Sequence, residues 1–286
     1  MRWEGRRESD NVEDRRGAPV RPGVAIGGGT LLLILVASLL LGQNPLQILD
    51  MLGGSIEQAP PPQETSPSTA APSETLRRFA SVVLANTEET WTRLFEQSGR
   101  PYRQPRLVLF TRAVQSGCGT ASSAVGPFYC PLDGQLYLDL SFFDELDRRF
   151  GAPGDFGAAY VIAHEVGHHV QNLLGIARQV SQQQQQAPQE EANALSVRME
   201  LQADCLAGVW GYHANRSAHL IEPGDFEEGL RAAAAIGDDR LQRNMQDTVQ
   251  PETWTHGSSQ QRVQWLRRGL ESGDPKACDT FADRRL

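Results

Sequence analysis

The segment His164-Glu165-Val166-Gly167-His168 carries the residue types that bind and activate a metal ion. Residues four apart on an α-helix lie about one turn apart on one face, so the imidazoles of His164 and His168 can share one ion. Glu165 lies about 100° around the axis from His164, where its carboxylate can act on water instead of the metal. The pattern predicts a hydrolytic zinc site with Glu165 as general base. The alternative is a buried helix whose two His only satisfy hydrogen bonds in the core.

A catalytic zinc site takes three protein ligands and leaves a fourth position for water. Residues 196–210 predict a second helix, on which Glu200 and Asp204 lie one turn apart among apolar residues. Since buried carboxylates need partners, we expect Glu200 to be the third ligand and Asp204 to orient a ligand imidazole. The alternative is a solvated helix face. A metzincin site is excluded, because Gln171 and Leu174 stand where that class needs Gly and His.

His256, in Thr255-His256-Gly257-Ser258-Ser259, is a candidate for catalysis. It could enter the cleft and donate a hydrogen bond to the oxyanion that forms during attack on a carbonyl group. Equally, the segment could be only a loop that caps the following helix. His169, His213 and His219 are expected to be structural or to face solvent.

The His-Glu-x-x-His motif with a later Glu-x-x-x-Asp resembles the gluzincin class of zinc metallopeptidases. Four segments are also similar to the bacterial membrane-anchored neutral zinc metallopeptidase family: residues 1–16, 126–131, 200–210 and 255–259. The resemblance spans nearly the whole chain apart from a linker and a Gln-rich insert. It implies a zincin-like fold and peptidase activity, but no particular substrate.

The elements that must position these residues follow from periodicity. Apolar residues between 158 and 174 recur at helical spacing, with Asp155 as a plausible N-cap and Gly175 as a stop. Other expected helices are 76–97, 142–150, 226–236, 238–246 and 258–272, and the expected strands are 106–110 and 135–140. The 135–140 strand could bind an extended peptide by strand addition or lie in the core. The Gln-rich stretch 182–191 is expected to be an exposed loop, or a lid over the cleft. The fold class expected is α+β, predominantly helical.

Residues 23–42 contain no charge and are long enough to cross a bilayer, which predicts a single transmembrane helix. A cleaved signal peptide is the alternative, but the small-x-small pattern fits poorly. Six Arg precede the span and the next basic residue is Arg77, so we expect a cytoplasmic tail at 1–22, disordered and without chemistry. Residues 43–75 are rich in Pro and Ser and predict a linker. The metallopeptidase domain would occupy 76–286, on the periplasmic or extracellular side of the inner membrane.

The four cysteines, Cys118, Cys130, Cys205 and Cys278, all follow the apolar stretch and fit an oxidising compartment. The pairs 118–130 and 205–278 are one possible connectivity, and two others remain open. Metal binding by cysteine is the alternative, but no Cys-x-x-Cys spacing occurs.

Together the residues predict a membrane-anchored zinc metallopeptidase that acts on a peptide or protein substrate. A membrane-tethered zinc-binding or chaperone-like module would instead need a fourth protein ligand, for which Asp204 and His169 are candidates. Hydrolysis of a non-peptide substrate is a third possibility. The net charge of −8 gives no support to nucleic-acid binding.

Overall fold

The computed structural model describes residues 1–17, 67–246 and 249–283. The chain divides into two units, of which the first comprises Met1–Ala18 and Pro72–Leu286. Most of the second unit, Pro19–Ala71, lies outside the described residues, and so does the expected membrane span at 23–42. The description that follows therefore concerns the first unit.

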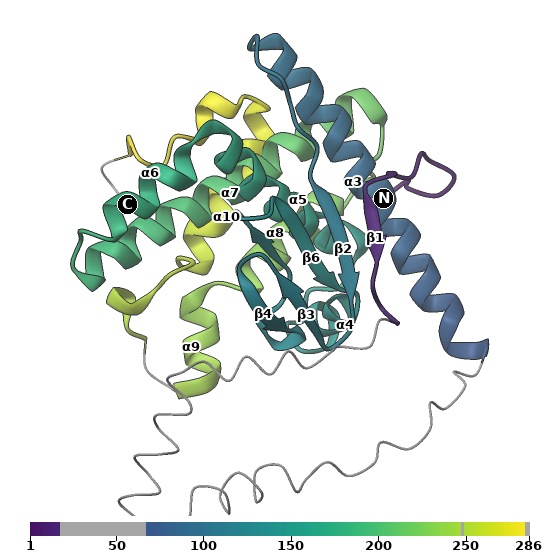
Figure 1. The fold of residues 1–286 in the computed structure, drawn as a ribbon, viewed down its shortest axis with the longest axis horizontal. Helices are drawn as coiled ribbons and strands as arrows, with labels where there is room; N and C mark the ends of the chain where they lie inside the picture. Colours follow the sequence, from purple (N-terminus) through teal and green to yellow (C-terminus); the bar gives the residue numbers. More distant parts are fainter. Residues whose placement is uncertain (18–66, 247–248, 284–286) are drawn as a thin grey trace, which may run out of the picture. The chain divides into compact units, whose positions relative to one another are not determined.

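The first unit combines a small sheet with many helices, so the expected predominantly helical α+β class is confirmed (Figure 1). Its helices are α3 (Pro67–Gln97), α4 (Ser141–Arg148), α5 (Asp155–Leu174), α6 (Ile176–Gln184), α7 (Gln189–Ala218), α8 (Asp225–Ala235), α9 (Asp238–Gln246) and α10 (Ser259–Ser272). Its strands are β1 (Val12–Asp14), β2 (Arg106–Phe110), β3 (Ala113–Ser116), β4 (Gly119–Ser122), β5 (Phe128–Cys130) and β6 (Gln135–Asp139). The unit also contains the short 3₁₀ helices η1 (Ser123–Val125), η2 (Pro251–Thr253) and η3 (Pro275–Cys278).

The main sheet has the strand order β1-β2-β6-β5. Strands β1, β2 and β6 run parallel, whereas β5 pairs with β6 in the antiparallel direction. Strand β6 is paired on both sides, so it cannot accept a substrate strand, and of its two interpretations the core strand is correct. The edge strands of this sheet are β1 and β5. Strands β3 and β4 form a separate hairpin.

Helices α5, α7 and α10 pack closely because small residues lie where their axes cross. A Cβ atom on Gly269 of α10 would lie 2.0 Å from the carbonyl oxygen of Cys205 on α7, so only glycine fits there. The buried rings of Phe156 on α5 and Trp210 on α7 stack with centroids 5.9 Å apart. Helices α5 and α7 are thereby fixed in position, and both carry predicted site residues.

The expected helices are present, with some boundaries moved. Helix α5 ends at Gly175, which adopts the expected left-handed conformation (φ 82°), but Asp155 is its first residue and not its N-cap. Helix α7 begins at Gln189, earlier than expected, and α3 begins at Pro67 within the expected linker. Most of the Gln-rich stretch 182–191 is exposed, as expected, but only residues 185–188 form a loop, because α6 extends to Gln184 and α7 begins at Gln189.

Residues 1–17 form a segment that we call the N-terminal strap, and it belongs to the folded unit. Its strand β1 pairs in parallel register with β2, with Val12 opposite Leu107. The ring of Trp3 packs edge-on against Phe79 at 5.4 Å. The expected disordered tail is therefore wrong for these residues, because strand pairing and core contacts hold them in place.

At the first residue of the strap, the α-amino group of Met1 lies 3.0 Å from the carboxylate of Asp155 and 3.4 Å from that of Asp225. In Figure 1 the strap lies beside α3, at the edge of the sheet.

No helix in residues 67–246 and 249–283 has the length and apolar character needed to cross a membrane. Membrane anchoring by residues 23–42 stays a prediction.

Candidate active site

The site is built where α5 crosses α7. A Cβ atom on Gly167, in the middle of the His-Glu-x-x-His motif, would lie 2.9 Å from the carbonyl oxygen of Ala203. Glycine at this position therefore permits the two helices to approach closely enough for their side chains to meet. His164 and His168 of α5 face Glu200 of α7 across this contact.

The three predicted ligands converge on one point. The Nε2 atoms of His164 and His168 are 3.2 Å apart, and they lie 3.1 Å and 3.3 Å from the two carboxylate oxygens of Glu200. Bonds of about 2.0–2.1 Å in a tetrahedral zinc site place neighbouring donor atoms ~3.3 Å apart. The separations in this cluster therefore match those that a zinc ion requires.

The Nδ1 atoms of both imidazoles already form hydrogen bonds. His164 donates from Nδ1 to Asp204 over 2.8 Å, and His168 donates from Nδ1 to the side-chain oxygen of Gln171 over 2.8 Å. In the neutral rings, the Nε2 lone pairs of His164 and His168 then point toward the carboxylate of Glu200. The two nitrogens and the carboxylate are all acceptors, so their convergence needs a cation between them. The donor set therefore fits zinc on chemical as well as geometric grounds.

Electrostatics favour positive charge at this point. Burial lowers the pKa of His164, but the charges of Asp204 and Glu200 outweigh it and raise that pKa to about 10. Burial likewise opposes ionisation of Glu200, yet the adjacent His168 and His164 hold the pKa of its carboxyl well below the usual range. The same charges that retain a proton at this point attract a metal ion.

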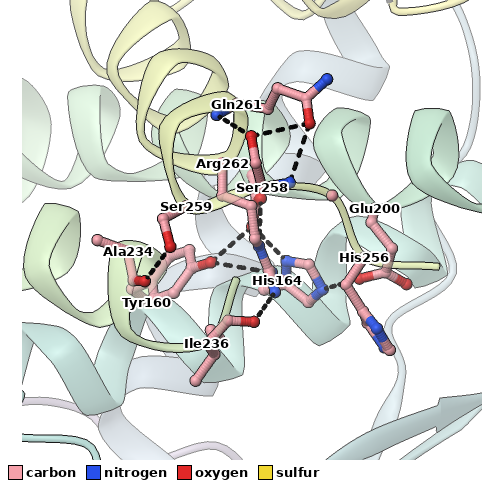
Figure 2. A network of polar contacts seen from close by, with 12 residues as sticks. Tyr160, His164, Glu200, Ala234, Ile236, His256, Ser258, Ser259, Gln261 and Arg262 are labelled. Carbon is pink, nitrogen blue, oxygen red and sulfur yellow. Dashed lines mark hydrogen bonds and ion pairs between the residues drawn. The ribbon is translucent and has the colours of Figure 1, made fainter. Parts of the chain in front are cut away.

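Asp204 is the centre of a buried polar network. Arg262 of α10 binds its carboxylate through two hydrogen bonds of 2.8 Å and 2.9 Å, and Tyr160 donates to it over 2.6 Å. Figure 2 places Tyr160 and Arg262 on one side of His164, with Glu200 and His256 on the other. Although burial raises the pKa of Asp204, Arg262 and His164 outweigh it and lower that pKa. Asp204 therefore stays ionised and holds His164, as expected from its spacing to Glu200.

The three predicted ligands, His164, His168 and Glu200, border a cavity of about 610 Å³. Glu165 lines it and is mostly buried, and burial raises the pKa of its carboxyl. On the sheet side the cavity is bordered by η1, by residues 126–131, which include β5, and by Phe142 and Phe150 near the ends of α4. None of residues 182–191 lines it, so the Gln-rich stretch does not cover the cleft in this structure.

His256 also lines the cavity, with half of its side chain exposed. Its Nδ1 atom lies 3.2 Å from the carboxylate of Asp238, and that hydrogen bond, opposed by burial, raises the pKa of His256. Asp238 also accepts the backbone N–H groups of Thr255, His256 and Gly257. The loop is fixed further by a capping box between Ser258 and Gln261. The segment therefore borders the cavity and also caps α10, while a catalytic role for His256 stays a prediction.

Sequence patterns did not reveal Gln171, Asp238, Tyr160 and Arg262. The position of Gln171 served only to exclude a metzincin, whereas its amide orients His168 and donates to the carbonyl oxygen of Met199. The nearest signal for Arg262 is its place on the apolar face of α10, beside Trp265 and Leu266, where a charge demands a partner.

His169 and His213 have structural contacts, as expected. His169 is buried and donates from Nε2 to the carbonyl oxygen of Arg103 over 2.7 Å, while burial lowers its pKa to about 4. Its Nδ1 atom lies 3.1 Å from the hydroxyl of Tyr129 on β5, which also accepts from Asn172. This contact fixes the edge strand against α5. His213 hydrogen-bonds to the carbonyl oxygen of Gly273.

The cysteines form the disulfides Cys118–Cys130 and Cys205–Cys278. Of the three possible connectivities, the structure contains the one named first above. The first bridge joins the β3–β4 hairpin to the end of β5, and the second ties η3 to α7 beside Asp204. Both bridges thus support elements that border the site.

Comparison with known proteins finds one matching family model and similar bacterial proteins. A family model described as "Putative neutral zinc metallopeptidase" matches residues 1–281. The uncharacterized protein YpfJ of Escherichia coli K12 is 50% identical over 288 residues, which cover 98% of this chain and 99% of that protein. The uncharacterized protein Rv2575 of Mycobacterium tuberculosis H37Rv is 48% identical over 191 residues, which cover 63% and 64% of the two chains. No solved structure matches.

Proposed function

The chain belongs to this family of neutral zinc metallopeptidases, and on that premise we propose that it is a zinc-dependent hydrolase that cleaves peptide bonds. The observation that carries the proposal is the convergence of His164, His168 and Glu200 at one end of a cavity that Glu165 also lines. A zinc ion held by these three residues supplies a Lewis acid that polarises the scissile carbonyl group and acidifies water.

The hydrogen bonds of two side chains, Asp204 and His169, favour an open catalytic site over a closed structural one. A structural site needs a fourth protein ligand, and Asp204 and His169 were the candidates. Both carboxylate oxygens of Asp204 are bound by Arg262, and one of them also by His164 and Tyr160. The ring of His169 is held by Arg103 and Tyr129. Neither side chain is available to the ion, which leaves a position for water or substrate.

In the proposed reaction Glu165 takes a proton from the attacking water and later transfers it to the leaving amine. The raised pKa of its buried carboxyl makes the group a better proton acceptor than an exposed glutamate at neutral pH. Tyr160 and Arg262 keep Asp204 in place, and Asp204 in turn keeps the ring of His164 in the tautomer that binds metal.

His256 is proposed to donate a hydrogen bond to the oxyanion that develops on the scissile carbonyl. Its Nδ1 atom faces Asp238, so its Nε2 atom is the one left for the cleft. Asp238 thereby sets the orientation of the ring and favours the protonated imidazole. A fixed donor of this kind stabilises the transition state more than the bound substrate.

The substrate is proposed to bind as an extended peptide along β5. This strand is an edge strand of the main sheet, and its residues Phe128 and Tyr129 line the cavity. An edge strand offers unpaired backbone groups to which a peptide can add. Tyr129 fixes β5 to α5 through Asn172 and His169, so a peptide paired with β5 would be held at a defined distance from the metal ligands.

Incubation of the full-length chain with a peptide library tests the proposal. We expect cleavage that a chelator abolishes and that one equivalent of zinc restores. The full chain is needed, because a fragment that begins at residue 74 lacks the N-terminal strap. Glu165→Gln, prepared in parallel, controls for contaminating peptidases.

The other two functions predict different outcomes in the same experiment. Zinc bound in one equivalent without any peptide cleavage would favour the binding or chaperone-like module. Chelator-sensitive hydrolysis of small esters or amides, without cleavage of peptides, would favour a non-peptide hydrolase.

A further inference from the structure

We infer that the N-terminal strap and the rest of the first unit lie on the same side of any membrane that the chain contacts. Three backbone positions of β1 pair with β2, from Val12 opposite Leu107 to Asp14 opposite Leu109. The ladder extends at both ends, since Leu107 donates to the carbonyl oxygen of Asn11 and Arg15 donates to that of Leu109, each over 2.8 Å. Strands that pair in this way lie about 4.8 Å apart.

Side chains of the strap also satisfy a buried charge. The carboxylate of Glu88 on α3 is 1% exposed, and it accepts hydrogen bonds from Ser9 over 2.6 Å and Asn11 over 2.8 Å. Arg7 forms an ion pair with it at 3.3 Å. Withdrawal of the strap would remove those three donors from the carboxylate. The strap is thus bound through its side chains as well as its backbone.

A single membrane crossing between β1 and α3 cannot coexist with these contacts. Residues 23–42 are the one stretch there with the length and composition of a span, because Asp50, Glu57 and Glu64 interrupt the sequence from 43 to 66. One crossing would separate β1 from β2 by the hydrocarbon core, which is about 30 Å thick. Strand pairing therefore requires that the chain makes no net crossing between the strap and α3.

The charge argument for a cytoplasmic strap is not decisive. Most arginines of the strap form ion pairs within the folded unit, among them Arg7 with Glu89 at 3.0 Å and Arg15 with Glu13 at 2.6 Å. Arg6 instead donates to the carbonyl oxygens of Arg2 and His219. The positive-inside rule counts Lys and Arg within about 15–20 residues of a span, whereas folded domains are translocated largely regardless of charge. Because the strap belongs to a folded domain and also lies next to residues 23–42, its arginines do not decide the orientation. The candidate active site then faces the compartment that contains the strap, and this holds whether or not the chain is a peptidase.

Cysteine accessibility in cells that express the full-length chain tests this inference. Asp10→Cys lies at an exposed position of the strap, and Gln186→Cys lies at an exposed position between α6 and α7. The described residues contain no free cysteine, so each variant adds one reactive thiol. A membrane-impermeant maleimide is applied to spheroplasts before and after permeabilisation, and the labelled fraction is read from the mass of the purified protein.

We expect the two variants to behave alike. Labelling of both before permeabilisation, or of both only afterwards, supports the inference and at the same time identifies the compartment. Labelling of one thiol before permeabilisation and of the other only afterwards would overturn it. As a control, the unfolding temperatures of the two purified variants are measured. Values equal to that of the wild type indicate that the strap remains docked in both.

Discussion

Asp204 holds His164 by a hydrogen bond of 2.8 Å between its fully buried carboxylate and the Nδ1 atom of the ring. The two residues come from different helices, α7 and α5, and the bond fixes the tautomer that leaves Nε2 free for a metal ion. Behind Asp204, the guanidinium group of Arg262 neutralises its charge. Metal binding and the stability of the helix packing should therefore respond together to changes in this network.

Arg262→Met should destabilise the fold and weaken metal binding. Asp204 keeps its bonds to His164 and Tyr160 but loses its guanidinium partner, and removal of one partner of a buried ion pair costs about 3–5 kcal/mol. Chemical unfolding of the metal-free protein measures the first effect, and competition with a chromophoric chelator measures the second. We expect zinc affinity to fall by about 10- to 100-fold.

Arg262→Lys is the matched variant, since it keeps the charge but loses the two parallel hydrogen bonds to Asp204. It should recover much of the stability and less of the zinc affinity. Equal zinc affinity in Arg262→Met and the wild type would show that the network does not act on the metal site.

Glu165→Gln should retain one equivalent of zinc. Its rate of peptide hydrolysis should fall by about 10²- to 10⁴-fold, because the amide cannot accept the proton of water. Glutamine preserves the size of the side chain, so the fold and the ligands should be unaffected. Zinc content by elemental analysis and cleavage rate on one defined peptide are the two measurements. Full activity in this variant would disprove the proposed mechanism.

Gly167→Ala should separate α5 from α7. The added Cβ atom would lie 2.9 Å from the carbonyl oxygen of Ala203, and relief of such overpacking typically costs about 1–3 kcal/mol. Because the metal ligands face each other across this contact, zinc affinity should fall as well.

Gly157→Ala on the same helix is the control for that change. Its Cβ atom would make only an ordinary contact of 3.5 Å with Ala232, and alanine favours a helix by about 1 kcal/mol over glycine. The control should therefore be neutral or stabilising. Equal losses in both variants would indicate a general effect of substitution in α5, not a specific close approach.

Asp238→Asn should shift the alkaline limb of the pH profile for kcat/KM to lower pH. The hydrogen bond to Asp238 raises the pKa of His256, so the protonated ring persists to higher pH in the wild type. If protonated His256 stabilises the oxyanion, activity is present below that pKa and is lost as the pH rises through it. Removal of the negative charge lowers the pKa and brings this loss to lower pH.

His256→Gln separates the catalytic from the structural role of this residue. The variant should lose most activity at every pH while its unfolding temperature changes little, because half of the side chain is exposed. An unchanged alkaline limb in Asp238→Asn, together with an active His256→Gln, would assign the loop to helix capping alone.

Ser9→Ala should destabilise the folded unit although Ser9 is far from the active site in sequence. Its hydroxyl donates to the buried carboxylate of Glu88 over 2.6 Å, and loss of such a donor costs about 1–3 kcal/mol. Asp10→Ala, at the neighbouring exposed position, should be neutral. A Ser9→Ala variant as stable as Asp10→Ala would show that the strap contributes little to stability.

The parts of the site that sequence predicted are those encoded by local spacing. His164 and His168, like Glu200 and Asp204, are four residues apart on a helix, so helical geometry alone places each pair on one face. Arg262 contacts Asp204 across 58 positions of sequence, and Asp238 contacts His256 across 18. No periodicity encodes such distances, so these partners became visible only in the folded chain.

The sheet was harder to predict than the helices for a related reason. Strand β2 is a continuous apolar run, Leu107 to Phe110, and was predicted with its correct ends. Strand β1 consists of Val12, Glu13 and Asp14, of which only Val12 has a high β-propensity, and three residues are too few to show alternation. It forms because β2 offers an open edge and α3 offers a buried carboxylate. Composition alone assigned this segment to a tail.

The pairing of β1 with β2 also has a consequence for synthesis. Val12 leaves the ribosome more than 90 residues before its partner Leu107, which at ~5–20 residues per second is a delay of about 5–20 s. During that interval β1 has no partner in the sheet, and the apolar stretch 23–42 emerges before Leu107. The strap can therefore dock only after that stretch has left the ribosome.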